Sequence, residues 1–194
     1  MDALETIEYK GHTILVYSEE EPMNPRVECD NLGVMLCFHT KYLLGDKARR
    51  DKSKNLPSVK PYDFDGWDEM RNWLVKEEAA EVICPLYLYD HSGLTIKTSP
   101  FGDRWDSGQV GFIYARREDI VSEYGNYSDN TLSTVKAVLE AEVKEYDDYL
   151  TGNVYRYVIK NAAGEEVESC GNCSGDIKPM IEECKSIIDQ YHTE

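Results

Sequence analysis

Two turn-like segments carry the side chains in this chain that are best suited to chemistry. The first is Asp90-His-Ser-Gly93 and the second is Asp106-Ser-Gly-Gln109, and both lie between strand-like apolar runs. Carboxylates, imidazoles and hydroxyls serve as general acids and bases, as nucleophiles or as metal ligands. Turns on a rigid sheet are frequent positions for such groups. We therefore expect a ligand-binding site formed by Asp90, His91, Ser92, Asp106, Ser107 and Gln109.

The same turns allow a catalytic and a structural interpretation. A catalytic site would use His39, Asp90, His91 and Asp106, with a histidine as base and a carboxylate that orients it. The serines stand in no Gly-x-Ser-x-Gly elbow, and only the fold could bring His39 to the turns. In the structural interpretation, Asp90 and Asp106 cap the turns, while Gly93 and Gly108 supply positive φ angles. The sequence therefore assigns no catalytic residue.

The cysteines could act as a nucleophile, as metal ligands or as a redox pair, but their positions in the sequence establish none of these roles. Cys37 and His39 share a face of a strand, and without a third group a buried thiol is favoured over a nucleophile. Cys170 and Cys173 have ligand spacing, but structural zinc requires a second pair that the chain lacks. A redox pair is favoured by a helix N-terminus, which lowers the pKa of a thiol, and a helix is expected to begin near Asp176. The residues between the pair and that helix, and the lack of a thioredoxin-like order of elements, argue against a redox pair. We expect neither a metal nor a cofactor.

The net charge and its distribution along the chain argue for some classes of binding partner and against others. The formal net charge is -16, which argues against a general nucleic-acid binder because such proteins contact phosphates with Lys and Arg. Residues 118–194 contain seventeen acids and six bases, whereas residues 41–60 contain two acids and seven bases. The ordinary interpretation of this acidity is solubility. The alternative is a surface that imitates the charge of nucleic acid.

Periodicity predicts a single α+β domain over residues 1–194, with a largely antiparallel sheet and about four helices. The basic segment at about 45–61 has little apolar content and is expected to be a flexible loop. Polar segments with prolines and turn residues are expected as loops at 19–25 and 30–33. The strands are expected at 7–9, 13–17, 34–38, 82–89, 94–98, 110–115, 154–159 and 167–170, and the helices at 65–78, 117–124, 130–150 and 177–191.

The helix at 130–150 has an apolar face for the core and a second face rich in acids. Such a face is usually the solvated side of a helix. If it continues in space into the acids that follow residue 164, it becomes the leading candidate for a mimic surface. The partner-binding residues are then Glu140, Glu142, Glu145, Asp147, Asp148, Glu165, Glu166 and Glu168.

The absence of export and membrane signals indicates the compartment. No apolar run approaches the roughly 18 residues that a membrane span needs. The N-terminal Met1-Asp-Ala-Leu-Glu5 also lacks the basic and then apolar pattern of a signal peptide. We expect a cytoplasmic protein without membrane contact.

Several segments together resemble a family of uncharacterised proteins of phages, plasmids and integrated elements. The resemblance implies a mobile-element context, but it supplies no catalytic mechanism. The basic segment at 47–61 departs from the family pattern. The resemblance rests on Tyr9-Lys-Gly-His-Thr-Ile14, Asp30-Asn-Leu-Gly33, Cys37-Phe-His39, Leu44-Gly-Asp46, Pro85-Leu-Tyr-Leu-Tyr-Asp-His-Ser-Gly93, Trp105-Asp-Ser-Gly-Gln-Val-Gly111 and Tyr149-Leu-Thr-Gly152.

Three functions remain open on these grounds. The first is a non-enzymatic inhibitor of a host defence system, of the anti-CRISPR or anti-restriction type. It would bind the basic nucleic-acid groove of a defence protein, as a DNA mimic, in a salt-sensitive way. The second is an enzyme or a nucleotide-binding or other small-ligand protein that uses the two turns. The third is a structural or regulatory interaction protein with aromatic anchors.

Overall fold

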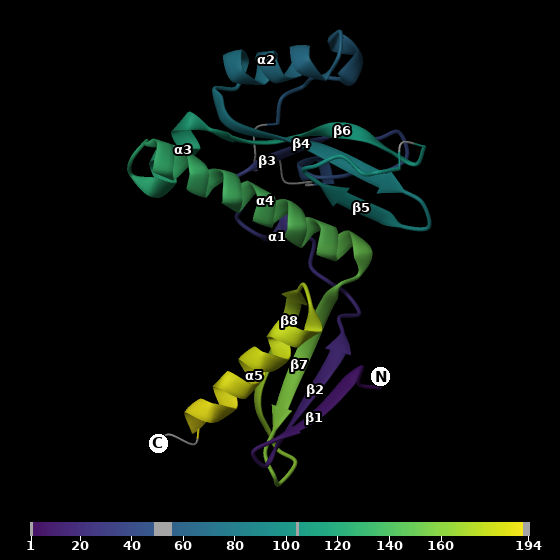
Figure 1. Cartoon of the computed structure of the whole chain (residues 1–194), viewed down its shortest axis with the longest axis vertical. Coiled ribbons are helices and arrows are strands. Elements are labelled where there is room, and N and C mark those ends of the chain that lie inside the picture. Colours follow the sequence, from purple (N-terminus) through teal and green to yellow (C-terminus); the bar gives the residue numbers. More distant parts are fainter. Residues whose placement is uncertain (1, 49–55, 104, 192–194) are drawn as a thin grey trace. The chain divides into compact units, whose positions relative to one another are not determined.

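The computed structural model describes residues 2–48, 56–103 and 105–191, and the chain forms two compact units (Figure 1). The first unit combines residues 1–23 with residues 148–194, and the second consists of residues 24–147. The long helix α4, Asp129–Thr151, contributes to both. Each unit has its own sheet and its own hydrophobic core.

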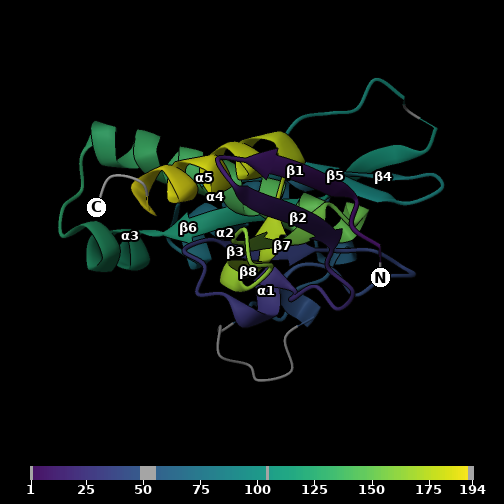
Figure 2. The same ribbon diagram turned by 90° about the horizontal axis from the view of Figure 1, so that it is seen from below.

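The first unit is a four-stranded antiparallel sheet with one helix against it. The strand order is β1-β2-β7-β8, and Figure 2 shows β1, β2 and β7 side by side. Alternate residues of β2 are buried, as Ile14 and Val16 show, and they pack with Cys184 and Ile188 of the helix α5. The elements are β1 Glu5–Tyr9, β2 His12–Ser18, β7 Val154–Lys160, β8 Glu166–Ser174 and α5 Ile177–Tyr191.

The second unit is a four-stranded antiparallel sheet with the order β3-β6-β4-β5. Its strand β6 is buried continuously from Val110 to Ala115, because α2 covers one face of the sheet and α4 the other (Figure 1). Met70 and Leu74 of α2 pack on Phe112 and Tyr114. The elements are α1 Pro25–Glu28, β3 Val34–Cys37, α2 Trp67–Glu77, β4 Ala80–Asp90, β5 Leu94–Lys97, β6 Ser107–Arg116 and α3 Arg117–Tyr124, with short 3-10 turns at Asp46–Ala48 and Pro61–Asp63.

The α+β prediction is confirmed, with every predicted strand and helix present to within a few residues. The antiparallel strands form two sheets rather than one. Pro85 lies in β4 before the pairing with β5 begins at Tyr87, so its missing N–H interrupts no ladder on that side. The prediction of a single domain stays a prediction.

A buried ion cluster links the segments expected as loops at 30–33 and 45–61 to the helix α4. Arg26, in the unpredicted short helix α1, is fully buried and donates to Asp46 Oδ1, Glu142 Oε2 and the carbonyl oxygen of Gly33, each at 2.7 Å. Asp46 in turn accepts from the backbone of Met35. We call Arg26, Asp46 and Glu142 the Arg26 cluster. It joins the beginning of the predicted basic loop to α4, while residues 49–55 of that loop lie outside the described part of the chain.

Candidate functional site

The structure brings the two predicted turns together at one end of the second unit's sheet. Tyr89 of β4 pairs with Ser107 of β6, and the backbone N–H of Asp90 donates to the carbonyl oxygen of Asp106 at 2.9 Å. This pairing places His91 Nδ1 3.1 Å from Asp106 Oδ2. The expected proximity of Asp90, His91 and Asp106 is therefore present.

His39 and Lys41 reach the same place from the segment that follows β3. His39 Nε2 lies 4.0 Å and Lys41 Nζ 3.6 Å from Asp90 Oδ2. His39 Nδ1 accepts from the backbone N–H groups of Lys41 and Tyr42, so its proton is on Nε2, which faces Asp90. The sequence offers no signal for Lys41, because only the antiparallel pairing of β3 with β6 brings this segment to the turns.

Ser92, Ser107 and Gln109 do not join this group. Ser107 Oγ donates to the carbonyl oxygen of Asp103, and Gln109 Nε2 donates to that of Gly111. Ser92 occupies the exposed turn itself, with φ of 60°. Of the two glycines expected at positive φ, Gly93 has this conformation, whereas Gly108 is a regular residue of β6 and that expectation is wrong.

We call His39, Lys41, Asp90, His91 and Asp106 the turn cluster. Exposure of its side chains to solvent weakens the electrostatic interactions on which acid-base chemistry would depend. The side chains of His91 and Asp106 are 63% and 39% exposed, so solvent screens their interaction. These residues line neither the hollow of about 840 Å³ beside residues 29–32 nor the hollow of about 410 Å³ beside α2. Among the described residues, no group of three or more His, Cys, Asp or Glu is arranged to bind a metal ion. The turn cluster is thus a surface group of two histidine-carboxylate pairs.

The alternative nucleophile Cys37 is a core residue. It is 2% exposed, and burial raises the pKa of its thiol to about 12, with a further contribution from the nearby Asp46 carboxylate. A thiol with this pKa is protonated at neutral pH and is a poor nucleophile. The interpretation as a buried thiol therefore describes Cys37 better than a role in catalysis.

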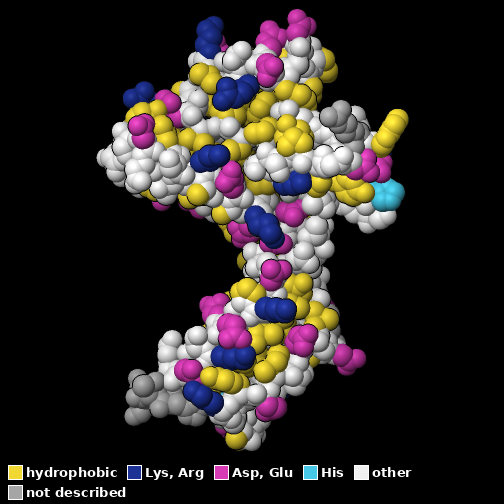
Figure 3. Space-filling view, in the orientation of Figure 1, with side chains coloured by type: hydrophobic (Ala, Val, Ile, Leu, Met, Phe, Trp, Pro, Cys, Tyr) yellow, Lys and Arg dark blue, Asp and Glu magenta, His cyan; other side chains and the backbone are white. Residues whose placement is uncertain are grey.

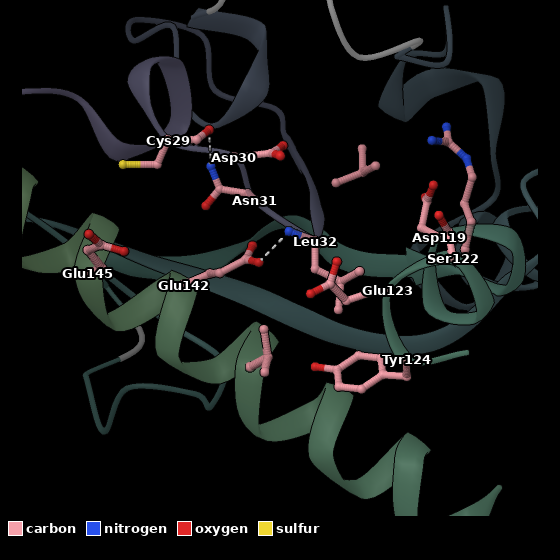
Figure 4. A pocket seen from close by; sticks show the side chains of 13 residues that line it. Cys29, Asp30, Asn31, Leu32, Asp119, Ser122, Glu123, Tyr124, Glu142 and Glu145 are labelled. Atoms are coloured by element: carbon pink, nitrogen blue, oxygen red, sulfur yellow. Dashed lines mark hydrogen bonds between the residues drawn. The ribbon is translucent and has the colours of Figure 1, made fainter. Parts of the chain in front are cut away.

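A second candidate site is a hollow of about 840 Å³ in the second unit. Figure 4 shows residues 29–32 on one side, α3 on another and α4 on a third. Leu32, Val34, Tyr124 and Val138 provide apolar surface inside it. The remaining lining is polar and mostly acidic, namely Cys29, Asp30, Asn31, Arg116, Asp119, Ser122, Glu123, Glu142 and Glu145.

The carboxylates around this hollow are poorly neutralised. The side-chain carboxylates of Asp30, Glu123 and Glu145 form no hydrogen bond or ion pair with any residue that the structure describes. The basic residue of the lining, Arg116, donates to Glu78 Oε2 at 2.5 Å and so carries a partner of its own. We call the hollow with its rim of Asp30, Asp119, Glu123 and Glu145 the acidic hollow. It presents concentrated negative charge beside an aromatic ring.

This negative charge affects the pKa of the Cys29 thiol. Its pKa is raised by burial first, and then by the carboxylates of Glu145 and Glu28, which oppose formation of a thiolate. The sequence pattern indicates Glu145 but gives no signal for Asp30, Asp119 or Glu123. Their segments are about 90 residues apart in the chain, and only the packing of α3 beside residues 29–32 brings them together.

The predicted acidic surface requires correction. Glu142 and Asp148 are only 9% and 3% exposed, so the prediction that they belong to an exposed surface is wrong. Glu142 is buried because it pairs with Arg26 and accepts from the backbone of Leu32 and Gly33. Asp147 accepts from the backbone of Ile96. The exposed or half-buried members are Glu140, Glu145 and Asp147 in the second unit and Glu165, Glu166 and Glu168 in the first.

The charges on the face seen in Figure 3 are mixed. Lys and Arg side chains lie between those of Asp and Glu on both units, so the described residues form no continuous acidic surface there. On α4, Glu140 also lies 3.8 Å from the basic residue Lys136. The acidic hollow is therefore a better candidate for a concentrated negative site than the helix face predicted from sequence.

Comparisons with known proteins do not assign a family. No family model and no solved structure matches the chain. A curated protein named Three-finger toxin MALT0066C, from Micrurus altirostris, is 35% identical over 51 residues, which are 26% of this chain and 61% of the toxin. None of the helices in the described part of the chain has the length and apolar content to cross a membrane.

Proposed function

We propose that this protein is a non-enzymatic inhibitor that binds a basic surface of a partner through the acidic hollow. The observation that carries the proposal is the set of side-chain carboxylates at Asp30, Glu123 and Glu145, which form no ion pair with any described residue. A cationic side chain that enters the hollow would supply this counter-charge and could stack on the ring of Tyr124. The net charge of -16 would add long-range attraction for a basic partner.

The kind of partner follows from this chemistry together with the resemblance to mobile-element proteins. Basic grooves are typical of proteins that handle nucleic acid, because such grooves neutralise phosphates. Mobile elements encounter host defence proteins with grooves of this kind. The proposed partner is therefore the basic nucleic-acid groove of a restriction or CRISPR protein, bound with fixed stoichiometry and without chemical turnover.

Capture of the partner from a bacterial lysate tests this proposal. Tagged wild-type protein is expected to retain a nucleic-acid-targeting defence protein at low salt and to release it at high salt, because ion pairs in solvent are screened. The variant Asp30→Asn/Glu123→Gln/Glu145→Gln should retain much less of it. Retention of the same protein at high salt, with equal amounts on the variant, would exclude binding through the acidic hollow.

A second candidate function rests on the two histidine-carboxylate pairs of the turn cluster, which suit binding of a small polar ligand. The variant Asp106→Asn distinguishes the two functions. Because the pair is exposed, we expect a change of less than about 1 kcal/mol in the free energy of unfolding, with inhibition of the partner unchanged. Urea unfolding and an inhibition assay measure both quantities. Complete loss of activity in a normally folded variant would favour the turn cluster instead.

A further inference from the structure

Cys170 and Cys173 flank a β-bulge in β8, an edge strand of the first unit's sheet. Cys170 stands opposite Tyr157 of β7, and Cys173 stands opposite Tyr155. Two residues of β8 therefore face the single residue Arg156. In a regular strand, residues three apart point to opposite faces, but the extra residue brings them back to the same face. Both thiols thus lie on the face of Tyr155 and Tyr157.

The bulge is fixed by contacts from residues distant in the chain. Asn172 has φ of 55°, its N–H donates to Glu19 Oε2 at 3.1 Å, and its Oδ1 accepts from the N–H of Met23 at 2.7 Å. A Cβ atom at Gly171 would lie 3.0 Å from Glu19 Oε2, so glycine suits the close approach. Glu19 and Asn172 therefore maintain the conformation that turns both cysteines to one face.

The two sulfur atoms differ in environment. Cys170 Sγ and Cys173 Sγ lie 3.6 and 3.8 Å from the same carbonyl oxygen, that of Gly171. Cys170 is exposed and Cys173 is partly buried. Burial, and then a hydrogen bond with Cys170, raises the pKa of Cys173 to about 12. A reagent in solvent therefore reaches Cys170 first. Cys173 stays protonated until it reacts in the second step.

We propose that Cys170 and Cys173 are a redox-active dithiol that forms an internal disulfide by exchange with a small disulfide such as oxidised glutathione. Cys170, as the thiolate, attacks one sulfur of glutathione disulfide, which releases one glutathione thiolate. Cys173 then loses its proton to solvent or to the departing thiolate and attacks the Cys170 sulfur, releasing the second glutathione. The protein loses two electrons and two protons, and one glutathione disulfide becomes two glutathione thiols.

The surroundings restrict the reaction to this pair. The third cysteine of the unit, Cys184, is fully buried in α5, and burial raises the pKa of its thiol to about 11. The helix α5 begins only at Ile177, so both thiols belong to the strand and not to a helix N-terminus. The bulge, rather than a helix dipole, is the feature that creates this site.

Equilibration of the full chain with mixtures of oxidised and reduced glutathione tests the proposal. Mass spectrometry of acid-quenched, alkylated samples should show loss of two hydrogen atoms and a peptide with linked Cys170 and Cys173. The variant Cys173→Ser should instead retain one glutathione on Cys170, because the second attack is lost. The variant Cys184→Ala should behave like the wild type. Absence of the link, or a link to Cys184, would overturn the proposal.

Glu19 provides a test of the bulge itself. The variant Glu19→Ala removes the acceptor of the Asn172 N–H, so the bulge no longer holds the two cysteines in position. A disulfide formed from a less suitable geometry is strained, and strain raises its reduction potential. We therefore expect the equilibrium constant for disulfide formation to fall about fivefold or more. Glu20→Ala changes an exposed neighbour and should leave the constant as in the wild type. Equal constants in both variants would show that the bulge does not direct the pair.

Discussion

Replacing Arg26 by alanine is expected to lower the free energy of unfolding by about 3–5 kcal/mol, because removal of one partner leaves buried charge uncompensated. Arg26 and Asp46 are fully buried, and Glu142 is nearly so. In the variant, two carboxylates would remain close to each other without the guanidinium that bonds both. Urea unfolding followed by circular dichroism measures the loss.

Two further variants distinguish the loss of stability caused by unpaired buried charge from the loss caused by missing side-chain packing in the Arg26 cluster. Arg26→Met keeps most of the side-chain volume and should be nearly as damaging as alanine, because the two carboxylates remain. The exposed Arg117, which pairs loosely with Glu81, is the matched control, and Arg117→Ala should cost less than about 1 kcal/mol. Equal stability of Arg26→Met and the wild type would show that the cluster contributes little.

Replacing Gly111 by alanine is expected to cost about 4 kcal/mol or more and to leave little folded protein at 37 °C. Gly111 lies in β6 opposite Cys37 of β3, and its φ is 157°. A Cβ atom there would stand 1.9 Å from the carbonyl oxygen of Leu36, which is backbone and cannot move aside without separation of the two strands. Thermal unfolding and yield of soluble protein measure the effect.

Gly108 is the matched control for this substitution, since it lies in the same strand and a Cβ atom added there would have nothing within 4 Å. Gly108→Ala should change the free energy of unfolding by no more than about 0.5 kcal/mol. A Gly111→Ala protein as stable as this control would contradict the close approach of β3 and β6.

The sequence predicts the elements of this fold well because their apolar residues have clear periods. Trp67, Met70 and Leu74 recur at helical spacing, and α2 covers the sheet with this face. Gly125 and Gly152 follow the last turns of α3 and α4 and end these helices in left-handed conformations, which is a common role of glycine at this position. The sequence pattern is sufficient to predict an element whose buried face and ends depend on residues close together in the chain.

The sequence fails where distant segments determine the environment of a residue. Glu142 shares its helix and its residue type with Glu140, yet one is buried and the other exposed, because Arg26 reaches only the first. Arg26 itself carries no signal, since a single arginine between loop residues is typical of a surface. The sequence predicts the turn cluster in part because Asp90 and Asp106 lie at the ends of adjacent strands, whereas the acidic hollow depends on the packing of α3 beside residues 29–32.

The assignment of the acidic hollow as the binding site is tested most directly by the affinity for a fluorescent arginine-rich peptide, measured by anisotropy at low and high salt. The two variants to compare each remove three carboxylates, Asp30→Asn/Glu123→Gln/Glu145→Gln from the hollow and Glu165→Gln/Glu166→Gln/Glu168→Gln from the first unit. With about 0.5 kcal/mol for each ion pair, the hollow variant should bind about tenfold more weakly than the wild type at low salt. The other variant should stay close to the wild type. Equal weakening in both would show that binding follows net charge alone and would contradict a site in the hollow.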